Sequence, residues 1–132
     1  MKIEVLYFEG CPNHKPAVER IQELLRDEGV SAEVLEACIS GASIAQEVGF
    51  LGSPTVRVNG LDVEPEARSA RKYGIMCRMY AVNGRREGLP SREMLRQAIR
   101  EAYFGVGNSG SGQDPSSKPK SRSSLFAVPP TR

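Results

Sequence analysis

A strand–helix–strand pattern in the N-terminal third constrains the fold more than any other feature of the chain. Residues 3–8 form a short apolar run that ends at Glu9-Gly10 and predicts a buried strand. Between Pro16 and Gly29, apolar residues recur at spacings of three and four, which predicts an amphipathic helix. Residues 31–39 alternate loosely and predict a second strand. Two strands joined through a helix form a βαβ unit, so these strands are expected to be parallel.

Asn-Gly pairs predict two hairpins further along the chain. Asn59-Gly60 separates β-rich runs within residues 55–63, and Asn and Gly tolerate the positive φ that both residues of a type I′ turn need. Asn83-Gly84 predicts a second hairpin in the same way. Helices are expected over residues 42–50 and 66–73 and after Ser91, which supplies an N-terminal cap. The expected fold class is α/β, with the element order β-α-β-(α)-β-β-α.

The last 28 residues differ in composition from the rest of the chain. Residues 105–132 contain seven Ser, four Gly and four Pro, which leaves too little apolar surface to offset the entropy of ordering. They also hold four Lys or Arg against one Asp, so the formal net charge of +2 comes from this segment. We therefore expect one folded domain over residues 1–104 and a disordered, Ser/Gly/Pro-rich basic tail over residues 105–132.

Charge, hydropathy and cysteine content exclude several classes of protein. The small net charge and the lack of aromatic residues interleaved with basic ones argue against a nucleic-acid partner. No apolar run approaches the ~18 residues needed to span a bilayer, and Glu4 interrupts the segment that a signal peptide would need. Three cysteines cannot all pair within one chain. We expect a cytoplasmic protein with reduced thiols and no membrane partner, and the sequence does not indicate its oligomeric state.

The connection between the first strand and the first helix carries the clearest candidate for chemistry. Gly10-Cys11-Pro12-Asn13-His14 lies there, and the free N–H groups and partial positive charge of a helix N-terminus favour a thiolate at Cys11. Pro12 stiffens the turn. His14 lies about one helical turn further on and can add positive charge or accept a proton. Cys11 is therefore the candidate nucleophile, and His14 is the residue expected to tune it.

The element order and these motifs together resemble a thioredoxin-like α/β sandwich. Gly10–His14 stands where that family carries its Cys-Pro-x-Cys active site, and residues 52–60 resemble the segment that places a cis-proline opposite it. The chain is most similar to small bacterial glutaredoxin-like or thioredoxin-like proteins with a Phe-x-Gly-Cys-Pro segment, some of which are labelled alkylmercury lyase. The resemblance implies a cis bond at Ser53-Pro54, with the backbone of Ser53 free to pair with an extended thiol substrate. Pro12, Ser53, Pro54, Thr55 and Arg78 are the expected substrate-binding residues.

One departure from the family pattern changes the expected chemistry. The position of the second active-site cysteine is occupied by His14, which cannot attack a mixed disulfide. A monothiol cycle remains, resolved by a small thiol such as glutathione or by Cys77. Cys77 lies beside Arg78 among other basic residues, which favour a thiolate and can hold the carboxylates of a glutathione-like ligand. Alternatively, Cys77 packs among its apolar neighbours, and the arginines are solvated. Cys38 is expected to be a buried strand cysteine.

Three functions remain open on the sequence alone. The first is a monothiol redox protein that exchanges small or protein thiols and disulfides through Cys11, with no required cofactor and glutathione as co-substrate. The second is a soft-metal or organomercurial binding or detoxifying protein, in which Cys11, His14 and Cys77 hold Hg or Zn and an acid such as Glu9 or Asp62 donates a proton. The third is a non-catalytic thioredoxin-fold binding module.

Overall fold

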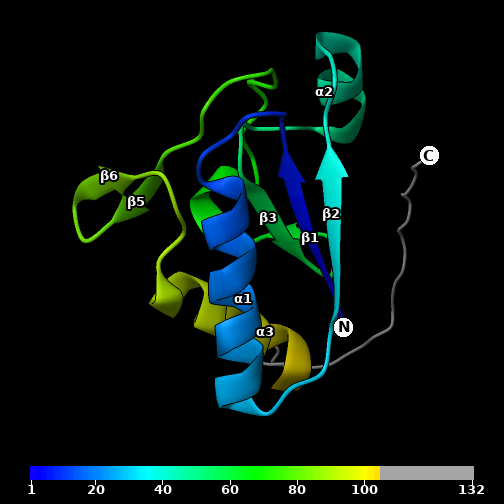
Figure 1. The fold of residues 1–132 in the computed structure, drawn as a ribbon. Helices are drawn as coiled ribbons and strands as arrows, with labels where there is room; N and C mark the ends of the chain where they lie inside the picture. The colour runs from blue at the N-terminus through cyan, green and yellow to red at the C-terminus, as the bar shows by residue number, and fades with distance from the viewer. Residues whose placement is uncertain (105–132) are drawn as a thin grey trace.

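The predicted strand–helix–strand unit is present at the start of the chain (Figure 1). The structure, a computed structural model, describes residues 1–104, and the predicted tail lies outside the described residues. Strand β1 (Lys2–Tyr7) leads into helix α1 (His14–Glu28) and then strand β2 (Glu33–Cys38). β1 and β2 pair in parallel, with Tyr7 opposite Cys38. Gly29 ends α1 in a left-handed conformation, as its place in the sequence predicts.

The remaining elements complete a four-stranded mixed sheet and a separate hairpin. Helix α2 (Ala42–Val48) precedes strands β3 (Thr55–Val58) and β4 (Leu61–Asp62). The strand order is β2-β1-β3-β4, and β3 is antiparallel to both of its neighbours. Strands β5 (Tyr80–Val82) and β6 (Arg85–Glu87) form their own two-stranded sheet, and helix α3 (Arg92–Phe104) follows.

Both Asn-Gly turns have the predicted backbone conformation. Asn59 and Gly60 have φ values of 51° and 85°, and Asn83 and Gly84 have φ values of 52° and 78°. A residue with a Cβ other than Asn or Asp rarely adopts such angles, so the two Asn-Gly pairs fix where the chain reverses. The hairpins predicted from these pairs are confirmed as β3–β4 and β5–β6.

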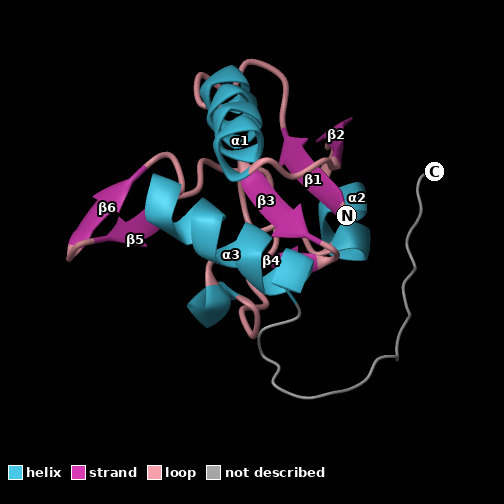
Figure 2. Cartoon of the chain, turned by 90° about the horizontal axis from the view of Figure 1, so that it is seen from below, coloured by secondary structure: helices cyan, strands magenta, loops and turns pink. Residues whose placement is uncertain are grey.

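Helices cover both faces of the four-stranded sheet (Figure 2). Residues of α1 and α3 share the larger core with alternate residues of β1 and β3. The smaller core lies on the opposite face, where Leu6, Ile39 and Phe50 pack with Ala45 of α2. No helix within residues 1–104 is long and apolar enough to cross a membrane.

The helix predicted over residues 66–73 is wrong, whereas the helix predicted after Ser91 is confirmed. Only a short 3-10 turn, η1 (Pro65–Ala67), forms in the first of these regions. Two alanines and a tyrosine offer too little apolar surface to stabilise a longer helix there. At α3, the Met94 N–H donates to the Ser91 hydroxyl over 3.0 Å, which satisfies one of the free donors of the first turn.

Candidate functional site

Cys11 lies in the turn between β1 and α1 and is partly exposed to solvent. Its N–H donates to the Phe8 carbonyl over 3.2 Å, and its own carbonyl accepts the His14 N–H at 3.4 Å. Asn13 is the N-cap of α1, so the free N–H groups of the first turn begin just beyond the cysteine. Gly10 and Pro12 on either side are exposed. The turn therefore places a partly exposed cysteine just before the N-terminus of α1.

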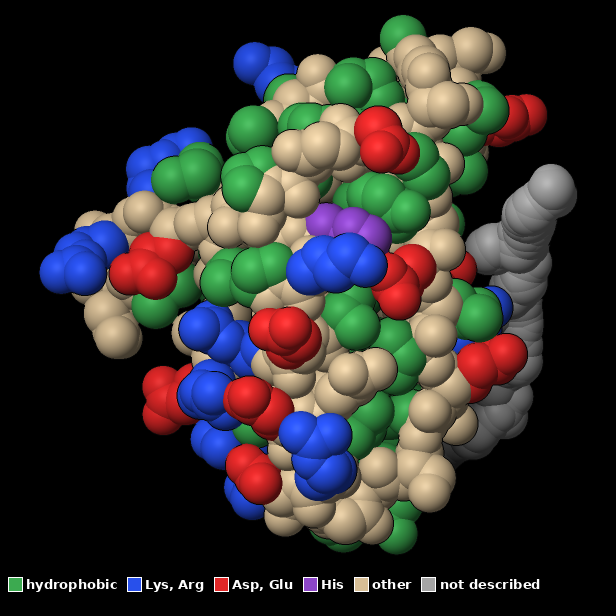
Figure 3. Space-filling view, in the orientation of Figure 1, with side chains coloured by type: hydrophobic (Ala, Val, Ile, Leu, Met, Phe, Trp, Pro, Cys, Tyr) green, Lys and Arg blue, Asp and Glu red, His purple; other side chains and the backbone are tan. Residues whose placement is uncertain are grey.

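His14 contacts the sheet and forms no hydrogen bond with Cys11 through its ring. The ring is stacked on Tyr7, with centroids 3.5 Å apart and an interplanar angle of 10°. Nε2 and the Glu36 Oε1 atom lie 2.6 Å apart. His14 as a whole is 8% exposed, and Figure 3 shows the histidine as a small purple area on this face. The imidazole thus fixes the start of α1 onto β1 and β2.

The Ser53-Pro54 segment lies beside the Cys11 turn but is buried. The Phe8 N–H donates to the Ser53 hydroxyl over 3.3 Å, which joins the two segments through the residue that also binds the Cys11 N–H. The Ser53-Pro54 peptide bond is cis. Ser53 is 1% exposed and Thr55 is 0% exposed, and the Thr55 hydroxyl donates to the Gly52 carbonyl. The predicted substrate-binding residues of this segment therefore lie beneath the surface.

The expectation that the backbone of Ser53 is free is wrong. The Ser53 N–H donates to the Met76 carbonyl over 2.8 Å, and the Ser53 carbonyl accepts the Arg78 N–H at 3.0 Å. Cys77, between these two residues, forms a parallel bridge with Ser53. We call residues 74–78 the strap. The strap occupies the hydrogen-bonding edge that the sequence assigns to a substrate.

Arg78 is buried and bound to two carboxylates of its own chain. Its Nη1 and Nη2 atoms lie 2.7 and 2.8 Å from the Asp62 carboxylate oxygens, and Nη2 lies 3.2 Å from Glu64. Burial by itself would lower the pKa of Arg78, but the hydrogen bonds and charges of these acids outweigh it and raise the pKa above its usual value. The guanidinium also lies over the Tyr80 ring, 4.1 Å from its centroid. Arg78 therefore anchors the strap, and its charge is already matched within the chain.

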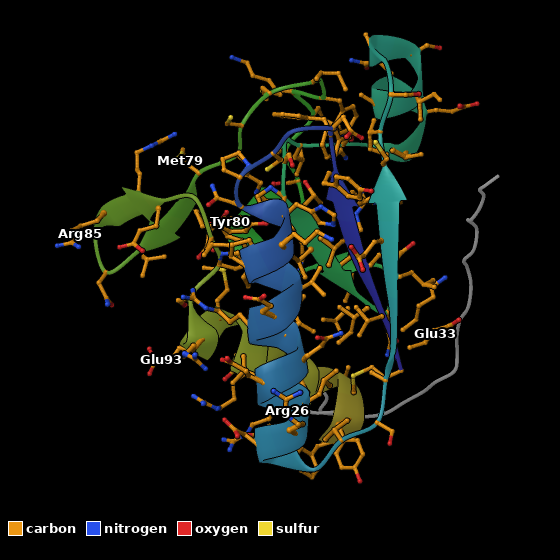
Figure 4. The ribbon with its side chains drawn as sticks, viewed as in Figure 1. Arg26, Glu33, Met79, Tyr80, Arg85 and Glu93 are labelled. Carbon is orange, nitrogen blue, oxygen red and sulfur yellow. The ribbon has the colours of Figure 1, made fainter. Side chains whose placement is uncertain are left out.

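Tyr80 packs against Arg78 and completes this buried cluster. It is 0% exposed, and its hydroxyl donates to the Pro54 carbonyl. Burial raises the pKa of Tyr80 above its usual value, although the neighbouring Arg78 charge opposes the shift. In Figure 4, Tyr80 lies close to the body of the domain, while Arg85 extends from the far end of the β5–β6 hairpin. Tyr80 thus ties the hairpin to the Ser53-Pro54 segment.

Cys38 is exposed, which contradicts the prediction of a buried strand cysteine. It is the last residue of β2, and β2 is an edge strand of the sheet, so neighbouring elements leave it accessible. Its register partner is Tyr7. Burial, followed by the charges of Cys38, Glu36 and Glu9, raises the pKa of Tyr7. Cys38 is thus an exposed cysteine beside Tyr7.

The three residues predicted as soft-metal ligands are not gathered into one site. Within residues 1–104, no group of three or more His, Cys, Asp or Glu side chains is placed to hold a metal ion. The His14 Nε2 atom is bound to Glu36, and Cys77 is exposed on the strap. Asp62, named as a candidate proton donor, is bound to Arg78 and 6% exposed.

Three acidic residues form contacts that the sequence analysis does not predict. Glu36 binds His14, and Asp62 and Glu64 bind Arg78. Glu36 lies two residues after Val34 and therefore on the same face of β2, the face that packs toward α1, so strand periodicity is the signal for its contact with α1. Comparisons of the chain with protein-family models, with curated proteins and with solved structures found no match.

Proposed function

We propose that this protein is a thioredoxin-like thiol protein that carries out thiol–disulfide exchange through Cys11. The observation that carries the proposal is the hydrogen-bonded connection of three segments at one end of the sheet. The Cys11 N–H donates a hydrogen bond to the Phe8 carbonyl, and the Phe8 N–H donates to the Ser53 hydroxyl. The backbone of Ser53 is in turn hydrogen-bonded to the strap that carries Cys77. A partly exposed thiol before a helix N-terminus is thereby placed next to a second exposed thiol-bearing segment.

The architecture supports the finer fold assignment. A parallel β1–β2 pair joined by α1 and an antiparallel β3–β4 hairpin give the strand order β2-β1-β3-β4. α1 and α3 contribute to the core on one face, and α2 contributes to the core on the other. In this proposal, the Cys11 turn corresponds to the active-site cysteine of thioredoxin-like proteins, and the Ser53-Pro54 segment corresponds to the residue pair that faces it.

The proposed reaction proceeds in two exchanges. The Cys11 thiolate attacks one sulfur of a disulfide R–S–S–R, so that a Cys11–S–S–R bond forms and RS⁻ leaves. A second thiolate, R′S⁻, attacks the sulfur of R, which releases the Cys11 thiolate and forms R–S–S–R′. Glutathione supplies R′S⁻ in the simplest cycle. Bonds and electrons balance in each step, and the chain needs no metal or resident cofactor for either.

The test is adduct formation with glutathione disulfide, located by peptide mapping and mass spectrometry. Cys11 is expected to form a mixed disulfide faster than Cys38, because Cys11 lies just before the N–H donors at the start of α1, whereas Cys38 is the last residue of strand β2. Cys11→Ser should abolish the fast phase, and Cys38→Ser, the matched control at another accessible thiol, should leave it intact. Equal rates at the two cysteines, or no adduct at Cys11, would contradict the proposal.

The same experiment separates the soft-metal hypothesis. Stoichiometric Hg²⁺ should protect Cys11 and Cys77 together from alkylation only if one ion binds both thiols. We expect Hg²⁺ to protect the accessible thiols independently, because the proposed exchange requires no ion that bridges Cys11 and Cys77. Joint protection of Cys11 and Cys77 at one ion per chain would favour the metal function instead.

A further inference from the structure

The strap closes the edge that an extended peptide would need. Both backbone hydrogen-bonding groups of Ser53 are bound to residues 76 and 78. The Gly74 N–H donates to the Phe50 carbonyl, so the start of the strap is held as well. A Cβ added at Gly52 would lie 3.0 Å from the Arg78 Cβ atom, which shows how closely the strap lies on this segment. An incoming strand therefore finds no free partner at Ser53.

The middle of the strap is held by its backbone and by its two ends. Ile75, Met76 and Cys77 are all exposed, with exposures of 44% and 40% for the first two, so their side chains contribute little packing. At one end, Arg78 is 5% exposed and bound to Asp62. Just before the other end, the Gln46 side-chain amide donates to the carbonyl of Tyr73, the residue that precedes the strap. The strap is thus anchored at both ends, and the exposed side chains between them can be substituted with little loss of packing.

Cys11 itself stays accessible beside this closed edge. The cysteine is partly exposed, and Gly10 and Pro12 next to it are exposed, whereas Ser53 and Pro54 are buried. A compact disulfide needs only a path to the sulfur, but an extended peptide gains its affinity from main-chain hydrogen bonds to a sheet edge. The two classes of substrate therefore place different demands on the site.

From this arrangement we infer that the strap sets the substrate class: Cys11 exchanges with low-molecular-weight disulfides such as glutathione disulfide, and extended protein disulfides are excluded. This inference rests on the proposed function of Cys11. Residues 75–77 act as an internal occupant of the Ser53 edge, and Arg78 holds them there. Loosening the strap should admit peptides without changing exchange with the small disulfide.

The test compares two disulfides on three proteins. The substrates are glutathione disulfide and the symmetric disulfide of a short extended peptide with a central cysteine, each referenced to its rate with free N-acetylcysteine. The proteins are the full chain, the variant with Ile75 and Met76 replaced by Gly, and the matched variant with the same two residues replaced by Ala, so that Cys77 is present in all three. Adducts at Cys11 are measured in a Cys38→Ser background. Two Gly in place of Ala raise the entropy of the loosened strap, which should increase the peptide rate by about fivefold or more.

The outcomes distinguish the inference from the function beneath it. Support requires a referenced peptide rate below that of glutathione disulfide in the full chain, and an increase confined to the Gly variant. Efficient reaction of the peptide with the full chain, or equal peptide rates in the Gly and Ala variants, overturns the inference and leaves the proposed function standing. Absence of a Cys11 adduct with either disulfide overturns both.

A second measurement covers a Gly variant that fails to fold. Hydrogen exchange of the full chain should show protected amides at Ser53 and Arg78, because both N–H groups are hydrogen-bonded across the strap. Exchange at the rate of an unstructured peptide at both positions overturns the inference, since the edge would then be open.

Discussion

Replacing Arg78 with Met should remove the main anchor of the strap and destabilise the whole domain. The guanidinium is 5% exposed and binds two acids whose side chains are 6% and 12% exposed. Methionine keeps the length of the stem but leaves both carboxylates without their cationic partner. Breaking a buried pair in this way costs ~3–5 kcal/mol.

The surroundings of the two acids place the expected loss at the lower end of that range. Asp62 still accepts the Glu64 N–H, and Glu64 still accepts the Ala81 N–H, each over 2.9 Å. We therefore expect a loss of about 3 kcal/mol in the free energy of unfolding. In urea this corresponds to a fall in the midpoint of about 2 M, for an m-value of about 1.5 kcal/mol/M. Far-UV circular dichroism is the suitable assay, because the chain has no tryptophan.

Two comparisons make this prediction specific. Arg85→Met removes an arginine that is 79% exposed and paired with Glu87 at 3.6 Å, so it should cost at most about 1 kcal/mol. Combining Arg78→Met with Asp62→Asn and Glu64→Gln removes the unpaired charges and should restore about 1 kcal/mol or more. If Arg78→Met unfolds within about 1 kcal/mol of the unsubstituted protein, the cluster is not the anchor and the reasoning fails.

The pH dependence of this loss follows from the direction of the Arg78 shift. The folded-state pKa of Arg78 lies above the value usual for arginine, so its contribution is fully present below that usual value and is lost only at higher pH. The destabilisation caused by Arg78→Met should therefore show no change that arises from arginine ionisation between about pH 6 and pH 9.

Three further substitutions test other parts of the site. Ser91→Ala should lower the free energy of unfolding by about 1 kcal/mol in urea, because the Met94 N–H loses its acceptor. Glu36→Gln should lower it by about 0.5–1 kcal/mol, since Glu36 is 41% exposed, and should shift the His14 imidazole nitrogen resonances in NMR spectra. Because the pKa of Tyr7 is raised, its stabilising contribution is present below about pH 10 and is lost as the pH rises through the raised value. Tyr7→Phe should remove the corresponding late-ionising phenol from an ultraviolet titration of the protein.

Local signals predict most of the fold, whereas the contacts of the strap are beyond their reach. Asn59-Gly60 and Asn83-Gly84 demand positive φ at defined positions, and Ser91 offers an acceptor at the right distance from a helix start, so these elements are confirmed. The helix predicted over residues 66–73 is wrong because this segment has no apolar face to pack against the core, and helix propensity alone does not stabilise a helix there. The predicted burial of Cys38 is wrong because the sequence does not show which strand forms an edge of the sheet.

Arg78 illustrates why sequence reasoning about charge is limited. Neighbouring arginines and lysines suggest a solvated basic face or a ligand site, but the fold brings Asp62 and Glu64 from 16 and 14 residues away and buries all three. The β3–β4 hairpin and the pairing of Cys77 with Ser53 bring Arg78 into contact with these two acids. The same pairing that buries Arg78 also fills the Ser53 edge, so strap stability and peptide exclusion should vary together. A variant that loosens the Arg78 anchor while the domain stays folded should therefore also gain reactivity with extended disulfides.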